Sequence, residues 1–471
     1  MFDPAGFDEF SYDGFSFDAG GEEFRASFAL TGPAGRAEFV ETVHLPSRNL
    51  AAESPSPRIA RLLALATGLS YYKAAAPARI SVAFGLTDAE RVFLTELIRN
   101  GLGEFAYRNR LPSALWPEIV GERLAAVPGE SAGGRARGDV LTLPPLVPVG
   151  GGKDSVVTIE SLKAVGADPT LFSVNTFPPI ERCAQVSGLK LVSARRRIDP
   201  RLIAANRDGA LNGHIPVTAI VSLIALLAAE RLGLGPVVMS TERSAAYGNL
   251  DWQGMHINHQ WSKSLEFEKL LRAALSADGP EDGAAGAGGA GLDPDLYFSL
   301  LRPLSELEIA RRFAKLPAYF GAFTSCNRAF RLNEETRASA WCRECPKCQF
   351  VFLILAPFIP AAELTAIFGG NLLDDEANLT GYAEILGLSG HKPFECVGEY
   401  SEALLALEML GEQSMPGEQP GWRGARLAPR LAERVRAQGA TVDAATRADL
   451  FAADAPHAVP PAFRTALDAL A

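Results

Sequence analysis

The first 55 residues alternate apolar and polar side chains with a period close to two. The alternation is clearest at residues 10–17, 24–30 and 37–45. Successive side chains of a strand point to opposite faces, so this period is typical of strands with one buried face. Asp13-Gly14 and Gly20-Gly21 add residues that favour tight turns. The pattern predicts a small antiparallel sheet at the N-terminus.

The period becomes helical over residues 57–110, most clearly at 59–69 and 89–100. A link rich in glycine, arginine and proline then covers residues 127–145. Such a composition is typical of a connection between folded units. We therefore expect an N-terminal unit of sheet and helices at residues 1–140.

Short apolar stretches and helical stretches take turns over residues 141–278. The predicted strands are residues 146–149, 171–174, 190–193 and 236–240. The predicted helices are residues 155–165, 180–187, 215–232 and 264–275. Strands that alternate with helices usually lie parallel, with helices packed on both faces of the sheet. This unit is therefore predicted to be α/β, with a doubly wound parallel sheet.

The rest of the chain is predicted to be mainly helical. Glycine and alanine dominate residues 279–291, which predicts a flexible insert. Regular helical sequence resumes over residues 292–410. A proline- and glycine-rich stretch at 415–424 then introduces a helical tail within residues 411–471.

Composition and charge narrow the classes of function. Of the 471 residues, 48% are hydrophobic and 21% are charged, as in an ordinary globular protein. The formal net charge of −10 argues against sequence-independent binding to nucleic acid or anionic membranes. The sequence has no apolar run of spanning length, and its acidic start is unlike a signal peptide. We expect a cytoplasmic protein that binds neither nucleic acid nor membranes.

A glycine-rich loop, Pro148-Val-Gly-Gly-Gly-Lys-Asp-Ser155, joins the first predicted strand of the α/β unit to a helix. Glycines let the backbone approach phosphate oxygens, and the free N–H groups of a helix N-terminus attract anions. The lysine adds positive charge, the aspartate can hold Mg²⁺, and the serine can donate to an oxygen. The predicted phosphate site consists of Gly150, Gly151, Gly152, Lys153, Asp154 and Ser155.

Two common phosphate loops do not fit this stretch. A Walker loop needs glycine where Val147 stands, and the Rossmann fingerprint needs glycine where Ser155 stands. The stretch instead resembles the Ser-Gly-Gly-x-Asp-Ser loop of the N-type ATP pyrophosphatases, with Gly150 in place of the first serine. This resemblance implies a HUP-like nucleotide-binding fold and cleavage of ATP to AMP and diphosphate. The alternative is an ordinary glycine-rich turn.

Four of the six cysteines form a second motif. Fifteen residues separate Cys326 from Cys342, and Cys345 and Cys348 follow at two-residue intervals. This spacing lets four thiolates reach one tetrahedral zinc ion, and a closed shell of four protein ligands is structural. A similar arrangement occurs in 7-cyano-7-deazaguanine synthase, and Pro303-Leu304 with Glu308-Ile309 echoes that family. We predict structural zinc; four reduced core cysteines are the alternative.

Three polar blocks stand out, at residues 241–249 after a predicted strand, at 257–268, and at 390–400 outside the α/β unit. Ligands of doubly wound sheets bind beyond the carboxyl ends of the strands, where the first two blocks are predicted to lie. The predicted proton carriers are Glu242, His259 and Cys396, and the predicted substrate ligands are Arg243, Asn258, Lys263 and Lys392. Solvated loops and, for Cys396, a small buried hydrophobe are the alternatives.

Together these blocks make residues 140–410 resemble the ATP-dependent UDP-N-acetylmuramoyl-L-alanyl-L-glutamate (UDP-MurNAc-L-Ala-L-Glu) epimerases of bacterial peptidoglycan synthesis. The resemblance implies an isomerase that inverts the terminal L-glutamate and converts ATP to AMP and diphosphate with Mg²⁺. Adenylation would remove the charge of the carboxylate and acidify the neighbouring C–H. Our hypothesis is that the adenylate then closes into an oxazolone through the preceding amide; the alternative is an open adenylate.

Two other functions fit parts of the sequence. The loop and the cysteines also suit ATP-dependent amidation or nucleobase modification of the deazaguanine synthase kind, although the N-terminal sheet and the long helical region argue against it. A nucleotide-binding protein without catalysis would account for Gly150 in place of serine. Diphosphate release that depends on UDP-MurNAc-L-Ala-L-Glu separates the three.

Overall fold

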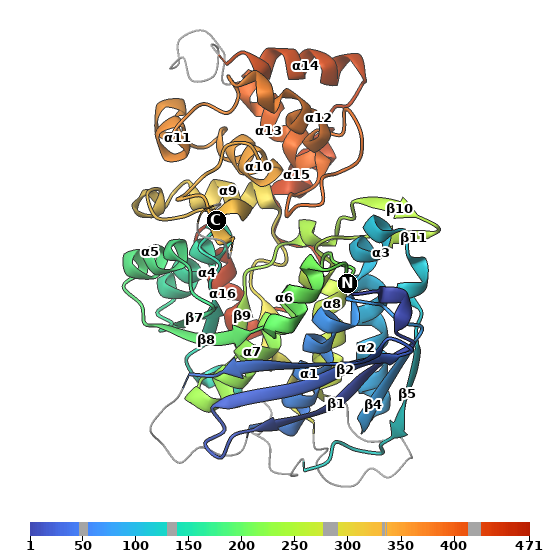
Figure 1. The fold of residues 1–471 in the computed structure, drawn as a ribbon. Coiled ribbons are helices and arrows are strands. Elements are labelled where there is room, and N and C mark those ends of the chain that lie inside the picture. The colour runs from blue at the N-terminus through green and yellow to red at the C-terminus, as the bar shows by residue number, and fades with distance from the viewer. Residues whose placement is uncertain (47–54, 130–138, 277–290, 332–334, 336, 413–424) are drawn as a thin grey trace.

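The computed structural model describes residues 1–46, 55–129, 139–276, 291–331, 335, 337–412 and 425–471 (Figure 1). The stretch predicted at 415–424 and, apart from residue 291, the insert predicted at 279–291 lie outside these ranges. The described chain is an α/β fold built on one large mixed sheet. No helix within the described ranges is long and apolar enough to cross a bilayer.

The main sheet takes ten strands from the N-terminal half and the middle of the chain. They are β1 (Glu9–Phe17), β2 (Glu23–Gly32), β3 (Gly35–His44), β4 (Arg79–Leu86), β5 (Glu118–Arg123), β6 (Leu146–Pro148), β7 (Thr170–Val174), β8 (Leu191–Arg197), β9 (Val237–Met239) and β12 (Tyr297–Ser299). Their order is β12-β9-β6-β7-β8-β3-β2-β1-β4-β5. A separate hairpin pairs β10 (Leu250–Trp252) with β11 (Met255–Ile257).

The strands β12, β9, β6, β7 and β8 form a parallel half, as predicted from the alternation of strands and helices. When these five strands are numbered 1 to 5 by their position along the chain, their order across the sheet is 5-4-1-2-3, which is typical of doubly wound sheets. Side chains of β6 and β9 enter two different cores, Val147 and Val238 on one face, Leu146 and Val237 on the other. Burial on both faces explains why these strands are continuous apolar runs.

The predicted N-terminal antiparallel strands are present as β1, β2 and β3, but they do not form a sheet of their own. Thr42 of β3 pairs with Arg197 of β8 and so joins this group to the parallel half. β4 and β5 extend the other edge in parallel, and the sequence pattern missed both because they lie in or next to mainly helical sequence. Strands on both sides of the boundary predicted at residue 140 therefore share one sheet.

Helices cover both faces of the sheet and continue beyond it. Within the described ranges the α-helices are α1 (Pro57–Tyr72), α2 (Asp88–Gly101), α3 (Gly103–Asn109), α4 (Lys153–Ala164), α5 (Pro178–Ser187), α6 (Pro200–Arg207), α7 (Val217–Leu232), α8 (Leu265–Ser276), α9 (Glu306–Phe313), α10 (Pro346–Leu355), α11 (Ala361–Phe368), α12 (Leu379–Ile385), α13 (Tyr400–Glu412), α14 (Leu427–Ala437), α15 (Ala444–Phe451) and α16 (Arg464–Asp468). Helices α1, α2, α7 and α8 share one core, and α4, α5, α9 and α10 share the other. Helices α10 to α15 gather at the top of Figure 1; α10 to α12 lie within the stretch predicted to be helical at 292–410, and α14 and α15 within the tail predicted at 411–471.

Candidate active site

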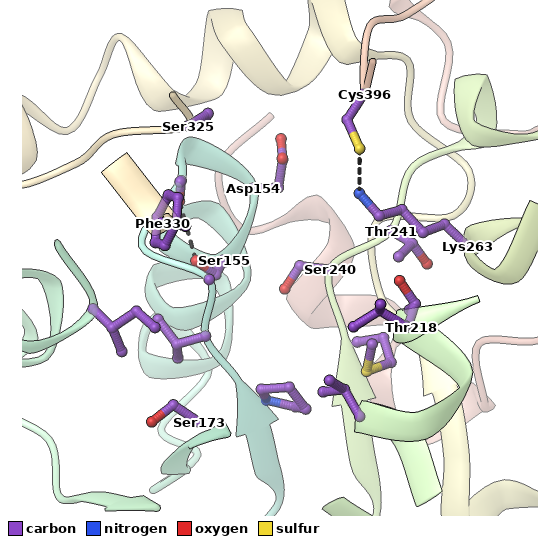
Figure 2. Close-up of a pocket in the computed structure, with 18 of the residues that line it drawn as sticks. Asp154, Ser155, Ser173, Thr218, Ser240, Thr241, Lys263, Ser325, Phe330 and Cys396 are labelled. Atoms are coloured by element: carbon purple, nitrogen blue, oxygen red, sulfur yellow. Dashed lines mark hydrogen bonds between the residues drawn. The ribbon is translucent and has the colours of Figure 1, made fainter. Parts of the chain in front are cut away.

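A cavity of about 520 Å³ lies at the carboxyl ends of β6 and β9, where the order of the parallel strands reverses. The glycine loop after β6 lines it, and so do Ser240, Thr241 and Glu242 after β9. Loops that follow two such strands diverge to opposite faces of the sheet, which leaves a crevice for a ligand. Figure 2 shows that side chains from both loops, Lys263 and Cys396 surround one space.

The glycine loop is shaped by steric limits at two of its three glycines. Gly151 has a φ of +78°, and a Cβ there would lie 3.0 Å from the carbonyl carbon of Pro179. Gly152 is the N-cap residue that precedes α4 and gives the helix no side-chain cap, and a Cβ there would lie 2.6 Å from Ser325 Oγ. Because no side chain caps α4 and Gly152, Asp154 and Ser155 line the cavity, the N-terminus of this helix faces the cavity, as anion binding there requires. Ser155 Oγ donates to the Gly152 carbonyl at 3.1 Å and also lines the cavity.

Lys153 does not line the cavity, although the sequence predicted it as a phosphate ligand. Its ammonium is buried and forms hydrogen bonds with the carboxylates of Asp154 and Glu306. Lys347 Nζ donates to the other Glu306 oxygen at 3.2 Å. Burial alone would raise the pKa of Glu306, but the charges of the two lysines hold it well below its usual value. Lys153 thus holds the Asp154 carboxylate at the start of α4 next to the Glu306 carboxylate at the start of α9.

Three carboxylates converge at this end of the cavity. One oxygen atom each of Asp154, Glu242 and Glu306 lies within 4.8 Å of the others. Burial and the charges of the other two raise the pKa of Glu242 to about 7. Magnesium is usually held by one or two carboxylates together with substrate phosphates and water, so this donor set fits the ion.

Cys396 lies in the loop between α12 and α13 and faces the cavity (Figure 2). Lys263 Nζ donates to its Sγ at 3.1 Å. Burial alone would raise the pKa of Cys396, but the charge of Lys263 and a hydrogen bond with His259 lower it to about 5. The side chain is therefore a thiolate at neutral pH, which is the form that accepts a proton.

His259 connects Cys396 to the N-terminal unit. Its Nδ1 lies 2.5 Å from Glu104 Oε2 on α3, and its ring packs against His214 at a centroid distance of 4.3 Å. Burial alone would lower the pKa of His259, but Cys396 and Glu104 raise it to about 9. Burial and the positive charge of His259 lower the pKa of His214 to about 3. His259 is thus the charged member of this pair.

Three other predicted residues lie outside the cavity wall. Arg243 forms an ion pair with Asp449 at 2.8 Å. The Asn258 amide donates to the Ala245 carbonyl at 2.9 Å, a contact that holds its own loop. Lys392 is buried and donates to the Tyr247 carbonyl at 3.0 Å, and burial lowers its pKa to about 8. The substrate-binding role of these three stays a prediction.

Four polar residues of the site were not singled out from the sequence: Glu104, Arg302, Glu306 and Lys347. Buried Arg302 donates to the backbone carbonyls of Glu242 and Lys263, both at 2.6 Å, and so fixes two cavity residues. Glu306 follows the helix cap Ser305, a position where glutamate is common for electrostatic reasons alone. The sequence pointed instead to Glu308, which pairs with Arg311 and Arg312. The role of these side chains depends on partners that are far away in the sequence, so it becomes visible only in the folded structure.

The four cysteines at residues 326–348 converge as the spacing predicted. Their sulfur atoms lie within 4.8 Å of one another. Cys348 Sγ lies 3.7 Å from Cys342 Sγ and 3.5 Å from Cys345 Sγ. Zinc–sulfur bonds of about 2.3 Å in a tetrahedron place sulfurs about 3.8 Å apart, so the donor set fits zinc.

Comparisons with known proteins agree over most of the chain. Residues 1–283 match the MurL N-terminal domain, and residues 322–446 match the MurL C-terminal domain. Three curated proteins, each described as UDP-N-acetyl-alpha-D-muramoyl-L-alanyl-L-glutamate epimerase, are similar to the chain. The Micromonospora sp. protein is 46% identical over 467 residues, which cover 98% of both chains.

The other two relatives extend the comparison. The Salinispora tropica protein is 47% identical over 472 residues, which cover 98% of this chain and 96% of the relative. The Xanthomonas oryzae pv. oryzae protein is 39% identical over 433 residues, which cover 90% of both chains. No solved structure matches the chain significantly. The chain therefore belongs to the MurL family.

Proposed function

We propose that the chain inverts the terminal L-glutamate of UDP-MurNAc-L-Ala-L-Glu and converts ATP to AMP and diphosphate. The reaction is supported by the names of the three relatives, which match at least 90% of the chain. ATP is supported by the loop that resembles the pyrophosphatase loop and by its place in the sheet. One observation carries the proposal: the open N-terminus of α4 and the Cys396 thiol line the same cavity.

Activation of the glutamate carboxylate gives ATP a chemical purpose. A C–H bond beside a carboxylate resists ionisation, because the carbanion would form next to a negative charge. Attack of a carboxylate oxygen on the α-phosphorus breaks the bond to diphosphate and leaves an acyl adenylate. The adenylate carbonyl is uncharged and withdraws electrons, so the neighbouring proton becomes acidic. The N–H groups at the start of α4 would bind the departing diphosphate.

Cys396 is our candidate for the group that takes the proton. Its thiolate would accept the α-proton while the C–H electron pair moves onto the carbonyl oxygen. A proton returned to the opposite face gives the D configuration, and Glu242 is the candidate donor. Water then attacks the acyl carbon and AMP leaves. If an oxazolone forms first, AMP leaves when the oxygen of the preceding amide attacks the acyl carbon, and water then opens the ring. Opening at the former amide carbon moves ¹⁸O from the amide into the product carboxylate, so such transfer establishes the oxazolone. An open adenylate, or ring opening at the acyl carbon, leaves the ¹⁸O in the amide.

Two metal ions belong to this proposal. Asp154 and Glu306 would hold Mg²⁺ with phosphate oxygens, and the ion would neutralise charge on the leaving diphosphate. Lys153 and Lys347 would keep Glu306 ionised for that task. Zinc would be held by the four cysteines, with no open position for substrate.

The test is diphosphate release from ATP with and without UDP-MurNAc-L-Ala-L-Glu, followed by chiral analysis of the glutamate. We expect release only with the peptide substrate and D-glutamate in the product. The Asp154→Asn variant should lose both, whereas Asp168→Asn, an exposed aspartate beyond the far end of α4, should keep both. Epimerisation without ATP, or ATP cleavage without inversion, would contradict the proposal.

A further inference from the structure

His259 lies between Cys396 and Glu104 in the fold, although it is 137 residues from Cys396 and 155 residues from Glu104 along the chain. The Glu104 carboxylate accepts from His259 Nδ1 at 2.5 Å. This contact leaves the second ring nitrogen of His259 for Cys396, whose interaction with the ring contributes to the raised pKa of His259. The order of groups is that of a thiol, an imidazole and an orienting carboxylate, as in hydrolytic triads.

Hydrogen bonds hold the His259 loop in register with the Cys396 loop. Asn249 Oδ1 accepts from the His259 backbone N–H at 2.8 Å, and its amide donates to the Pro393 carbonyl at 2.7 Å. The next residue, Gln260, donates to the Val397 carbonyl at 3.1 Å. These bonds tie the His259 loop to residues on both sides of Cys396. Backbone as well as side-chain contacts therefore set the position of His259 relative to Cys396.

We propose that Glu104 is a positioning residue that holds His259 as an imidazolium and thereby keeps Cys396 as a thiolate. A buried imidazolium is costly without a counter-charge, and the Glu104 carboxylate is only 6% exposed. Its second oxygen accepts from Arg108 Nε at 2.5 Å, which fixes the carboxylate from the solvent side. The role of that thiolate on substrate rests on the proposed function, whereas its charge state does not.

Other charged groups also influence the charge states of Cys396 and His259. Those that interact with Cys396, His259 or His214 are Lys73, Lys263, Lys347, Lys392 and Glu395. Lys263 would remain after loss of Glu104, so the thiolate is weakened rather than abolished. Removal of the Glu104 charge lowers the pKa of His259, and a neutral His259 stabilises the thiolate less. We therefore expect the pKa of Cys396 to rise in a Glu104→Gln variant, because loss of the imidazolium charge beside the thiolate outweighs loss of the more distant repulsion from Glu104.

The experiment measures alkylation of Cys396 by iodoacetamide against pH in the full-length, zinc-loaded chain, read from the Cys396 peptide by mass spectrometry. Because only the thiolate reacts, the midpoint of this profile reports the pKa of Cys396. We expect the midpoint to rise by about one unit or more in E104Q and to stay in place in Glu104→Asp. Glu96→Gln, the same change on the neighbouring helix α2, should leave the midpoint unchanged.

A His259→Gln variant keeps the test decisive if E104Q does not fold. Its midpoint must rise at least as far, and adding E104Q to it must cause no further shift, because Glu104 acts through His259. An unchanged midpoint in folded E104Q or in H259Q, or additive shifts in the double variant, would overturn the proposal. So would a second zinc ion per chain that is lost in E104Q, since Glu104 and the two histidines would then bind metal. If the midpoints shift as expected but the wild-type protein does not epimerise UDP-MurNAc-L-Ala-L-Glu, only the proposed function is rejected, and the role of Glu104 stands.

Discussion

The glycine loop allows a test of how closely the chain surrounds the predicted phosphate site. Gly151 has a left-handed backbone, and a Cβ there would meet the carbonyl carbon of Pro179 at 3.0 Å and the Ile180 nitrogen at 3.1 Å. Both are backbone atoms at the start of α5, so rotation of a side chain cannot relieve the clash. Gly166 has the same φ of +78° with nothing within 4 Å, and Gly150 has open space without a left-handed backbone. Alanine at the three positions separates backbone strain from steric conflict.

The structure sets the size of each effect. Gly166→Ala should lower the free energy of unfolding by about 1 kcal/mol, the cost of a left-handed alanine. Gly151→Ala should lower it by about 2–4 kcal/mol, because about 1–3 kcal/mol of overpacking adds to the strain. Gly150→Ala should change it by less than about 0.5 kcal/mol. Urea unfolding followed by tryptophan fluorescence gives these differences.

ATP affinity measured by calorimetry provides the second half of the test. A displaced Gly151 would shift the N–H groups at the start of α4, so we expect at least a tenfold loss of affinity in Gly151→Ala alone. If Gly151→Ala is no less stable than Gly166→Ala, the start of α5 moves away from the new Cβ at no measurable cost, and the steric argument is wrong. If Gly151→Ala is less stable but binds ATP normally, the loop does not hold the phosphates.

Three further predictions follow from the site. The epimerisation rate should be highest between about pH 5 and 7, falling below about 5 as Cys396 gains a proton and above about 7 as Glu242, the candidate proton donor, loses one; a tenfold rise from pH 7 to 9 would contradict this. Purified protein should contain one zinc ion, and Cys348→Ser should lose it together with about 2 kcal/mol or more of stability, as measured by metal analysis and thermal unfolding; zinc-free wild type of equal stability would contradict this. We expect Arg243→Gln to change the KM for UDP-MurNAc-L-Ala-L-Glu less than twofold, because the Arg243 guanidinium pairs with Asp449 outside the cavity wall; a tenfold rise would instead support the substrate-binding role that the sequence predicts for Arg243.

Local sequence carried much of the fold. Strands buried on one face alternate, strands buried on both faces are continuous apolar runs, and helices have their own period, so β1 to β3 and β6 to β9 were predictable. The glycine loop and the cysteine cluster were predictable for the same reason. A left-handed turn needs glycine, and two-residue spacing brings thiolates together, whatever the rest of the chain does.

The tertiary structure decided which of these local elements contact one another. Hydrogen bonding between β3 and β8 merged two predicted sheets into one, and no periodicity within either strand encodes that pairing. Glu104 and His259 come together across 155 residues, and the chain path alone makes one the partner of the other. The same path turned Lys153 away from the cavity and brought Glu306 into it. Periodicity and turn chemistry act over a few residues, whereas the charge state of a side chain depends on neighbours that only folding supplies.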